Sequence, residues 1–391
     1  MTANGIVCPV GRNCRRSAQS GDGHARAQAK PVAKSKSMIS EEVALNHAFE
    51  ENGIEVVETD LGEYIVQLNK ETPSHIVMPV MHRTKREIRD LFMRELNMPF
   101  TDDAAEMTAF IRKHLRHVFV EADMGISGGN FIIAETGTLC LVTNEGNGRM
   151  VTALPKCHIG IVGIEKVIET IEDYATLTQI LPRSATGQQM TVYTQMINGP
   201  RRDDEPDGPD EVYVILVDNG RSKVYATKYA EALACIRCGA CLNACPVYQV
   251  TGGHAYGWVY SGPIGAVITP ALTGLENATP LPQASSLCGK CKQVCPVDID
   301  IPRMLLDLRH DEVQQGMTDK LYDVGIKAWS IGNSSPALFQ MGGAAARIGT
   351  RFLPNQLPGP LAGWTKYRDF PQFAPKSFHQ MWQERKKGKP S

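Results

Sequence analysis

Three features that would assign a function quickly are missing from this sequence. The longest apolar stretches, 158–164 and 212–217, fall far short of the roughly 20 residues that a membrane helix needs. The glycine-containing stretch 184–188 matches neither the P-loop pattern nor the dinucleotide-binding fingerprint. The net charge is only −1 over 391 residues, which indicates no nucleic-acid partner and no capture by an anionic membrane. We therefore expect neither a transmembrane segment nor a nucleotide-dependent enzyme.

The first 31 residues are predicted to be disordered or to form an atypical N-terminal segment. They are rich in Gly, Ser, Ala and Gln, and basic residues outnumber acidic ones. Arg15 and Arg16 form a pair, but no apolar run follows them, so an export signal is not favoured. A cytoplasmic location is expected.

The sequence predicts an α/β fold for residues 32–222. Short apolar runs at 131–134, 139–142, 159–162 and 212–217 predict buried strands, and 64–68 predicts a further one. A helical pattern at 165–181 follows the third of these runs. Strands that alternate with helices predict a largely parallel sheet.

Seven of the eleven cysteines lie in two short windows, which favours metal binding in a reducing compartment over a disulfide framework. The first window, 235–246, has the spacing C-x2-C-x2-C-x3-C-P, and the second, 285–296, keeps the same phase with serine at its first position. Such runs bind cubane iron-sulfur clusters, and the last cysteine of each run ligates the other cluster. Structural zinc would instead favour separated pairs of cysteines.

This crossed scheme predicts two clusters. A [4Fe-4S] cluster would use Cys235, Cys238, Cys241 and Cys295. The second cluster, [4Fe-4S] or [3Fe-4S], would have only three thiolates, from Cys245, Cys288 and Cys291. Ser285 stands where its fourth cysteine would be.

Two possibilities for Ser285 stay open: it faces the second cluster, or it caps the helix that carries Cys288. His254 lies in the loop between the windows, but a lone histidine in a Gly/Tyr-rich loop does not indicate a ligand. The 42 residues between Cys245 and Cys288 exceed what a minimal ferredoxin hairpin needs. Leucines at helical spacing follow the second window, so the sequence predicts an α-helical ferredoxin domain.

Polar residues also gather at the two ends of the strand predicted at 139–142. Glu135 precedes the strand, and Glu145 and Arg149 follow it. Ligand sites of α/β proteins lie at such strand ends, and Arg149 could pair with a carboxylate. Two glycine turns decorated with polar residues would give the same pattern, so the candidate pocket and the purely structural interpretation both stay open.

Five motifs in order resemble the iron-sulfur subunit of the bacterial lactate-utilisation complex. They are Lys-Ser-Lys-Ser-Met at 34–38, Glu-Thr-Asp-Leu-Gly-Glu at 58–63, Pro-Ser-His-Ile at 73–76, Asn-Glu-Gly-Asn-Gly-Arg at 144–149 and the start of the first window. The resemblance covers residues 32–391. It implies an α/β LUD domain at 32–222, with a fold like that of the sugar-phosphate isomerase and CoA-transferase superfamily. A ferredoxin domain at 223–312 and a family-specific tail at 313–391 would follow.

The resemblance also implies the seven cysteine ligands, a second window that begins with serine, and a role in oxidising L-lactate to pyruvate. The implied partners are a LUD-only subunit, a cysteine-rich subunit and an electron acceptor towards the respiratory chain. Family members carry several tens more residues before the motif at 34–38, so the LUD domain is expected to lack its first helices and one strand.

We expect this chain to transfer electrons within that complex. It has no flavin or nicotinamide fingerprint, so turnover by the chain alone is not favoured. Two alternatives stay open: a LUD-domain enzyme that binds the 2-hydroxy acid itself, and a scaffold or redox sensor.

Overall fold

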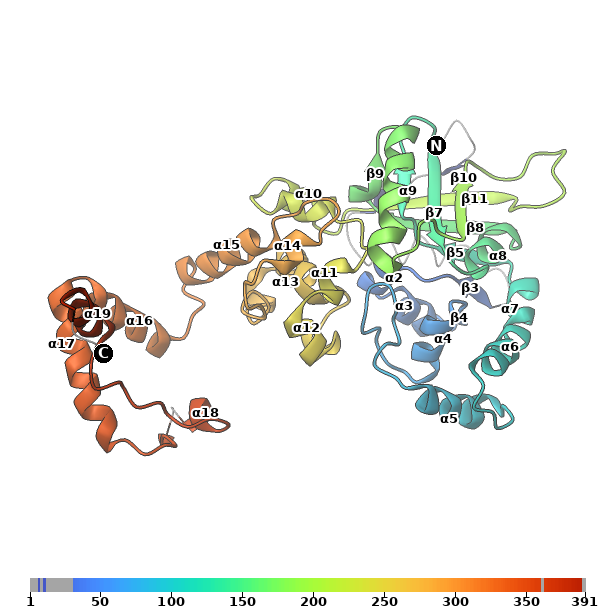
Figure 1. Cartoon of the computed structure of the whole chain (residues 1–391). Helices are drawn as coiled ribbons and strands as arrows, with labels where there is room; N and C mark the ends of the chain where they lie inside the picture. Colours follow the sequence, from blue (N-terminus) through green and yellow to red (C-terminus); the bar gives the residue numbers. More distant parts are fainter. Residues whose placement is uncertain (1–5, 8–9, 12–30, 360–361, 389–391) are drawn as a thin grey trace. The chain divides into compact units, whose positions relative to one another are not determined.

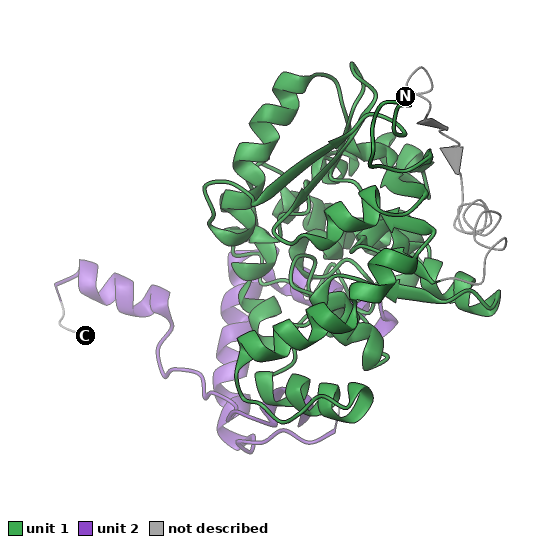
Figure 2. Ribbon diagram, turned by 90° about the vertical axis from the view of Figure 1, so that its right-hand side faces the viewer, with its two compact units in different colours: residues 1–315 green, residues 316–391 purple. Residues whose placement is uncertain are grey.

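The computed structural model describes residues 6–7, 10–11, 31–359 and 362–388. The chain divides into two compact units, residues 1–315 and 316–391 (Figure 2). In the described ranges, no helix combines the length and apolarity required to cross a bilayer.

A parallel sheet forms the centre of the first unit (Figure 1). Its strand order is β1-β11-β8-β5-β3-β4, and β2 also pairs with β11. Every pairing in it is parallel. Its strands are β1 Ile6–Val7, β2 Val10–Gly11, β3 Val32–Lys34, β4 Val56–Glu58, β5 Met124–Ser127, β8 Cys157–Gly163 and β11 Glu211–Val217.

A second, mixed sheet has the order β10-β7-β6-β9. It comprises β6 Phe131–Ile133, β7 Thr138–Thr143, β9 Val167–Ile168 and β10 Tyr193–Ile197. Apolar residues of β6 and β7 pack against Val162, Val212 and Val214 of the main sheet. This sheet therefore covers the β8–β11 part of one face.

Helices cover the rest of the main sheet. Residues of α2 and α3 share a core cluster with β8 and β11 on the opposite face. Helices α4 to α8 enclose a second core cluster near β3. These helices, with α9 and α10, are α2 Met38–Glu42, α3 Leu45–Glu51, α4 Leu61–Leu68, α5 Lys85–Leu96, α6 Ala104–His114, α7 Arg116–Glu121, α8 Asn147–Ala153, α9 Ile171–Thr186 and α10 Arg221–Tyr225.

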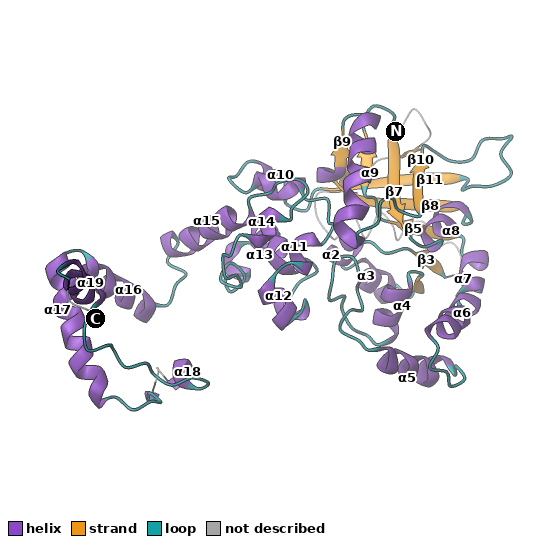
Figure 3. Ribbon diagram, viewed as in Figure 1, coloured by secondary structure: helices purple, strands orange, loops and turns teal. Residues whose placement is uncertain are grey.

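After residue 222 the described chain forms helices and loops (Figure 3). The cysteine-bearing region contains α11 Ala240–Asn243, α12 Pro246–Thr251, α13 Gly262–Thr273, α14 Lys290–Gln293 and α15 Ile301–Gln314. The second unit contains α16 Lys320–Asn333, α17 Pro336–Gly349, α18 Ala362–Thr365 and α19 Phe378–Lys386.

The predicted α/β class and its parallel sheet are confirmed, and so are the strands expected at 131–134, 139–142, 159–162 and 212–217. The strand expected at 64–68 is wrong, because these residues lie in α4. Asp60 caps that helix by accepting bonds from the N–H groups of Gly62 and Glu63, which sets a helix start in spite of the β-branched residues. The predicted helix at 165–181 begins later, after β9.

The N-terminal segment falls largely outside the described residues, including most of the stretch that was predicted to be disordered. Its described residues Ile6–Val7 and Val10–Gly11 differ from that prediction, because they pair with β11. The parallel ladder of β11 has an open edge there that accepts a further strand.

His158 is a fully buried histidine of β8. The Ser127 hydroxyl donates to the Gly128 carbonyl and lies 2.8 Å from His158 Nε2, so Nε2 carries the ring proton. Its Nδ1 is buried and has no hydrogen-bond partner among the described residues. Burial lowers the pKa of His158 to about 4, because a second ring proton would be desolvated and unpaired.

We expect this histidine to destabilise the fold in mild acid. Between about pH 6.5 and pH 4 the unfolded chain binds a proton that the folded chain does not, so stability falls as the pH falls through this window. The loss between pH 7 and pH 5 should be about 2 kcal/mol. Urea unfolding of the wild type and of His158→Gln at both pH values measures it: the variant should lose less stability. An equal loss in both proteins would contradict this assignment.

Candidate iron-sulfur centre and the adjoining cavity

Two residues in the left-handed backbone conformation shape the first cysteine window. Arg237 has φ +61° and Gly239 has φ +77°, one on each side of Cys238. This turn leads directly into α11, which carries Cys241. The backbone N–H of Arg237 donates to Cys235 Sγ at 3.4 Å. The window therefore folds back on itself and brings Cys235, Cys238 and Cys241 close together.

The thiols of the two windows influence one another: burial raises the pKa of Cys241, and Cys235, Cys238 and Cys291 act in the same direction. Burial raises the pKa of Cys238 to about 11, and the Cys235 and Cys295 thiols act in the same direction. Burial likewise raises the pKa of Cys291 to about 11, with smaller contributions from Cys245 and Cys288. Cys295 of the second window thus lies close to Cys238 of the first.

These groups suit iron-sulfur clusters better than free thiols. Cys238, Cys241, Cys245 and Cys291 are buried, Cys235 and Cys295 are half-buried, and Cys288 is exposed. Desolvated thiolates that repel one another are costly unless cations neutralise them. In the described ranges, no three His, Cys, Asp or Glu side chains are placed to hold a single metal ion. The buried thiols fit iron-sulfur clusters because iron ions would neutralise the thiolates.

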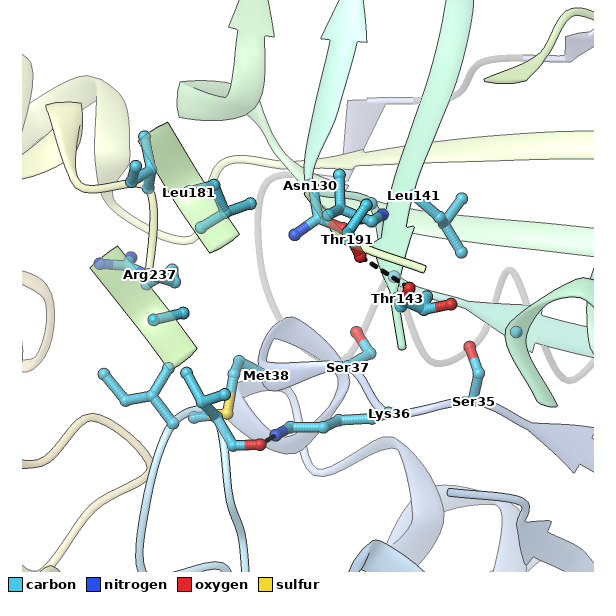
Figure 4. A pocket seen from close by; sticks show the side chains of 18 of the residues that line it. Ser35, Lys36, Ser37, Met38, Asn130, Leu141, Thr143, Leu181, Thr191 and Arg237 are labelled. Atoms are coloured by element: carbon cyan, nitrogen blue, oxygen red, sulfur yellow. Dashed lines mark hydrogen bonds between the residues drawn. The ribbon is translucent and has the colours of Figure 1, made fainter. Parts of the chain in front are cut away.

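A cavity of about 500 Å³ adjoins the first window. Figure 4 places Ser35, Lys36 and Ser37 on one side of it and Asn130 and Thr143 on another. Apolar walls come from the second sheet and from α9. Ile236 and Arg237 of the cysteine window also line this cavity.

Lys36 brings a positive charge to the cavity, and its ammonium donates to the Val77 carbonyl. Burial lowers the pKa of Lys36, while Glu63, Asp60 and Glu145 act in the opposite direction. Burial, and next the carboxylate of Asp60, raises the pKa of Glu145. The cavity thus combines basic side chains, among them Lys36 and Lys166, with carboxyl groups, as sites for small polar molecules do.

Comparison with known proteins shows to which family the chain belongs. The LUD domain model matches residues 22–217, the 4Fe-4S dicluster domain model matches 231–299, and the model of the lactate utilisation protein B C-terminal region matches 309–387. Lactate utilization protein B of Bacillus cytotoxicus is 46% identical over 371 residues, which is 93% of this chain and 78% of that protein. The proteins of that name from Bacillus thuringiensis and Bacillus cereus are 46% identical over 369 residues, with the same coverage.

The chain belongs to the lactate utilization protein B family. The structural comparison pairs it with a DUF162 family protein from Deinococcus radiodurans, at 13% identity and a TM-score of 0.23, over 52% of this chain and 98% of that protein. The LUD and dicluster matches agree with the predicted order of an α/β domain followed by an iron-sulfur domain.

The three candidate pocket residues do not lie together in the LUD domain. Only Glu145 lines the cavity. The Glu135 carboxylate accepts the backbone N–H of Ile171 at the start of α9, and Arg149 lies over the ring of Tyr193. Glu135 and Arg149 are not lining residues, so the structure gives them local roles.

Sequence reasoning missed Lys36, Asp60 and Lys166 as lining residues. Lys36 and Asp60 belong to two of the motifs that carried the resemblance, which was the available signal. The Lys166 ammonium donates to the Cys235 carbonyl at 2.5 Å. Lys166 thereby connects the LUD cavity with the first cysteine window.

His254 contacts the LUD domain. Its Nε2 is 2.7 Å from the Thr72 carbonyl oxygen, and its ring packs edge-on against His82. These contacts join the loop between the windows to the LUD domain.

A buried charge network joins the LUD and dicluster domains. The Arg221 guanidinium binds both Glu42 carboxylate oxygens at 2.7 Å and Glu165 at 2.5 Å. Tyr260, from the loop between the windows, donates to Glu42 at 2.6 Å. Arg237 extends the network, with its guanidinium 4.4 Å from the centre of the Tyr260 ring. The first cysteine window is therefore held by hydrogen-bonded charges as well as by apolar packing.

Proposed function

We propose that this chain is the iron-sulfur electron-transfer subunit of a complex that oxidises L-lactate to pyruvate. The proposal is supported by the closeness of Cys295 to Cys238, and of Cys245 and Cys288 to Cys291, in a chain of the lactate utilization protein B family. Iron-sulfur clusters supply one-electron transfer. Their redox chemistry suits a subunit that relays electrons from a partner.

The proposed ligands follow the crossed scheme. Cys235, Cys238, Cys241 and Cys295 hold a [4Fe-4S] cluster, and Cys245, Cys288 and Cys291 supply three thiolates to the second cluster. The backbone N–H groups of Arg237 and Ile299 donate to the sulfurs of Cys235 and Cys295 at 3.4 Å. Such bonds to cluster sulfurs help to set reduction potentials.

The proposed working parts are a LUD domain at 32–222, an α-helical ferredoxin domain at 223–312 and a C-terminal tail at 313–391. The proposed partners are a LUD-only subunit and a cysteine-rich subunit, with an electron acceptor towards the respiratory chain. We place this complex in the cytoplasm, where thiolate ligands stay reduced.

The isolated chain is expected not to convert L-lactate to pyruvate with a one-electron dye, whereas the assembled complex does. Oxidation of L-lactate removes two electrons and the hydrogen on the carbon that carries the hydroxyl group. A cubane alone does not provide an acceptor for both. Anaerobic assays of pyruvate formation compare the two. Sustained turnover by the single chain would overturn the carrier role and move substrate oxidation to the LUD cavity around Lys36 and Glu145.

A further inference from the structure

The two cysteine windows are structural copies of each other, although only the first begins with cysteine. Leu287 and Gly289 have φ +54° and +80°, which matches Arg237 and Gly239 in the first window. Leucine rarely adopts this left-handed conformation. Its presence shows that the second window is held in the conformation of the first despite the strain.

The hydrogen bonds that follow also match. Helices α11 and α14 begin at the second residue after Cys238 and Cys288, and each has four residues. The backbone bonds of the first window are Leu242→Gly239 3.0 Å, Asn243→Gly239 3.2 Å, Ala244→Ala240 3.1 Å and Cys245→Leu242 3.1 Å. Those of the second are Lys292→Gly289 3.1 Å, Gln293→Gly289 3.2 Å, Val294→Lys290 3.1 Å and Cys295→Lys292 3.1 Å.

Ser285 occupies the position of Cys235 in this copy. The Cys235 thiol accepts the N–H of Arg237 at 3.4 Å. The Ser285 hydroxyl oxygen accepts the N–H of Leu287, also two residues later, at 3.1 Å. The side chain of Ser285 is therefore turned into its own window as the side chain of Cys235 is.

The backbone of both residues is anchored in the same way. A Lys166 ammonium donates to the Cys235 carbonyl at 2.5 Å, and the Arg309 guanidinium donates to the Ser285 carbonyl at 3.0 Å. A serine that only formed a local turn would not need a basic side chain to hold its carbonyl group. The matching bonds to the Cys235 and Ser285 carbonyls therefore favour a shared role for the two residues.

We propose that the Ser285 oxygen is the fourth ligand of the second cluster, completing the corner that Cys245, Cys288 and Cys291 leave open. This inference rests on the proposed cluster ligands. The hydroxyl loses its proton to solvent as the iron-oxygen bond forms, and no electron is transferred in that step. The oxygen keeps a lone pair for the Leu287 N–H. The second cluster is then a four-iron cluster with one oxygen-ligated iron.

Iron analysis and spectroscopy of the anaerobically purified chain test this ligand. The wild type should contain about eight irons per chain, and ⁵⁷Fe Mössbauer spectra should contain one iron subsite distinct from the thiolate-ligated ones. Ser285→Ala should lose about one iron and gain the electron paramagnetic resonance (EPR) signal of a [3Fe-4S] cluster. Ser330→Ala is the control, because Ser330 is exposed in α16, outside both windows, and it should keep the wild-type iron content.

Ser285→Cys keeps the test decisive if the alanine variant loses its fold. It should retain about eight irons, lose the distinct subsite and shift the reduction potential of one cluster only. Wild-type iron content and spectra in Ser285→Ala, or an unchanged potential in Ser285→Cys, would overturn the serine ligand while leaving the two clusters in place. About four irons in the wild type would overturn the second cluster itself, and with it the proposed set of ligands.

Discussion

Cys238→Ala is expected to remove the first cluster and about half of the iron, from about eight to about four per chain. Alanine offers no donor atom, and Cys238 is the central thiol of the first window. Its side chain also packs with Phe131, Tyr174 and Leu181 of the LUD domain. We therefore expect a further loss of about 1 kcal/mol in the stability of that domain.

Iron and sulfide analysis with EPR measures the cluster loss, and far-UV circular dichroism follows the fold. Cys157→Ala is the control, because Cys157 lies in β8 outside both windows and should keep all of the iron. Full iron content in the Cys238 variant would contradict the ligand assignment. Loss of iron from both variants would point to general instability.

Arg221→Leu is expected to be the most destabilising single change, at about 3–5 kcal/mol. Arg221 and Glu42 are almost fully buried, with side-chain exposures of 1% and 0%. Removing the guanidinium leaves Glu42 charged and desolvated with only the bonds from Asn219 and Tyr260, and it takes from Glu165 one of its basic partners. Because Tyr260 also binds Glu42, the dicluster domain should loosen together with the LUD domain.

Denaturant unfolding of the anaerobic protein measures this loss. Arg201→Ala is the control, because the Arg201–Asp210 pair is exposed on the surface and should contribute at most about 1 kcal/mol. If the two variants unfolded at the same denaturant concentration, the buried network would not hold the domains together.

The cysteine windows could be predicted from the sequence because their geometry is local. Spacing alone places the thiols on one turn and a short helix, and the ferredoxin rule predicts a crossing that would bring Cys295 to the first group. The anchoring of Cys235 and Ser285 could not be predicted this way. Lys166 and Arg309 come from distant segments, and only the tertiary fold brings them to the two carbonyls.

The cavity was predicted less well for the same reason. Glu145 was found because it follows a buried strand, but Arg149, on the same turn of chain, packs on Tyr193 instead of entering the cavity. Spacing along a segment does not determine which face of α8 is covered. The error at 64–68 had a local cause: β-branched residues favour strands, while the cap at Asp60 sets a helix.

The most direct test of the electron-transfer role is to follow the clusters while L-lactate is added without oxygen. EPR at low temperature would be recorded for the isolated chain and for the assembled complex. We predict that L-lactate reduces the clusters of this chain only in the complex. Reduction in the isolated chain, or oxidised clusters in a complex that is forming pyruvate, would contradict the role proposed for it.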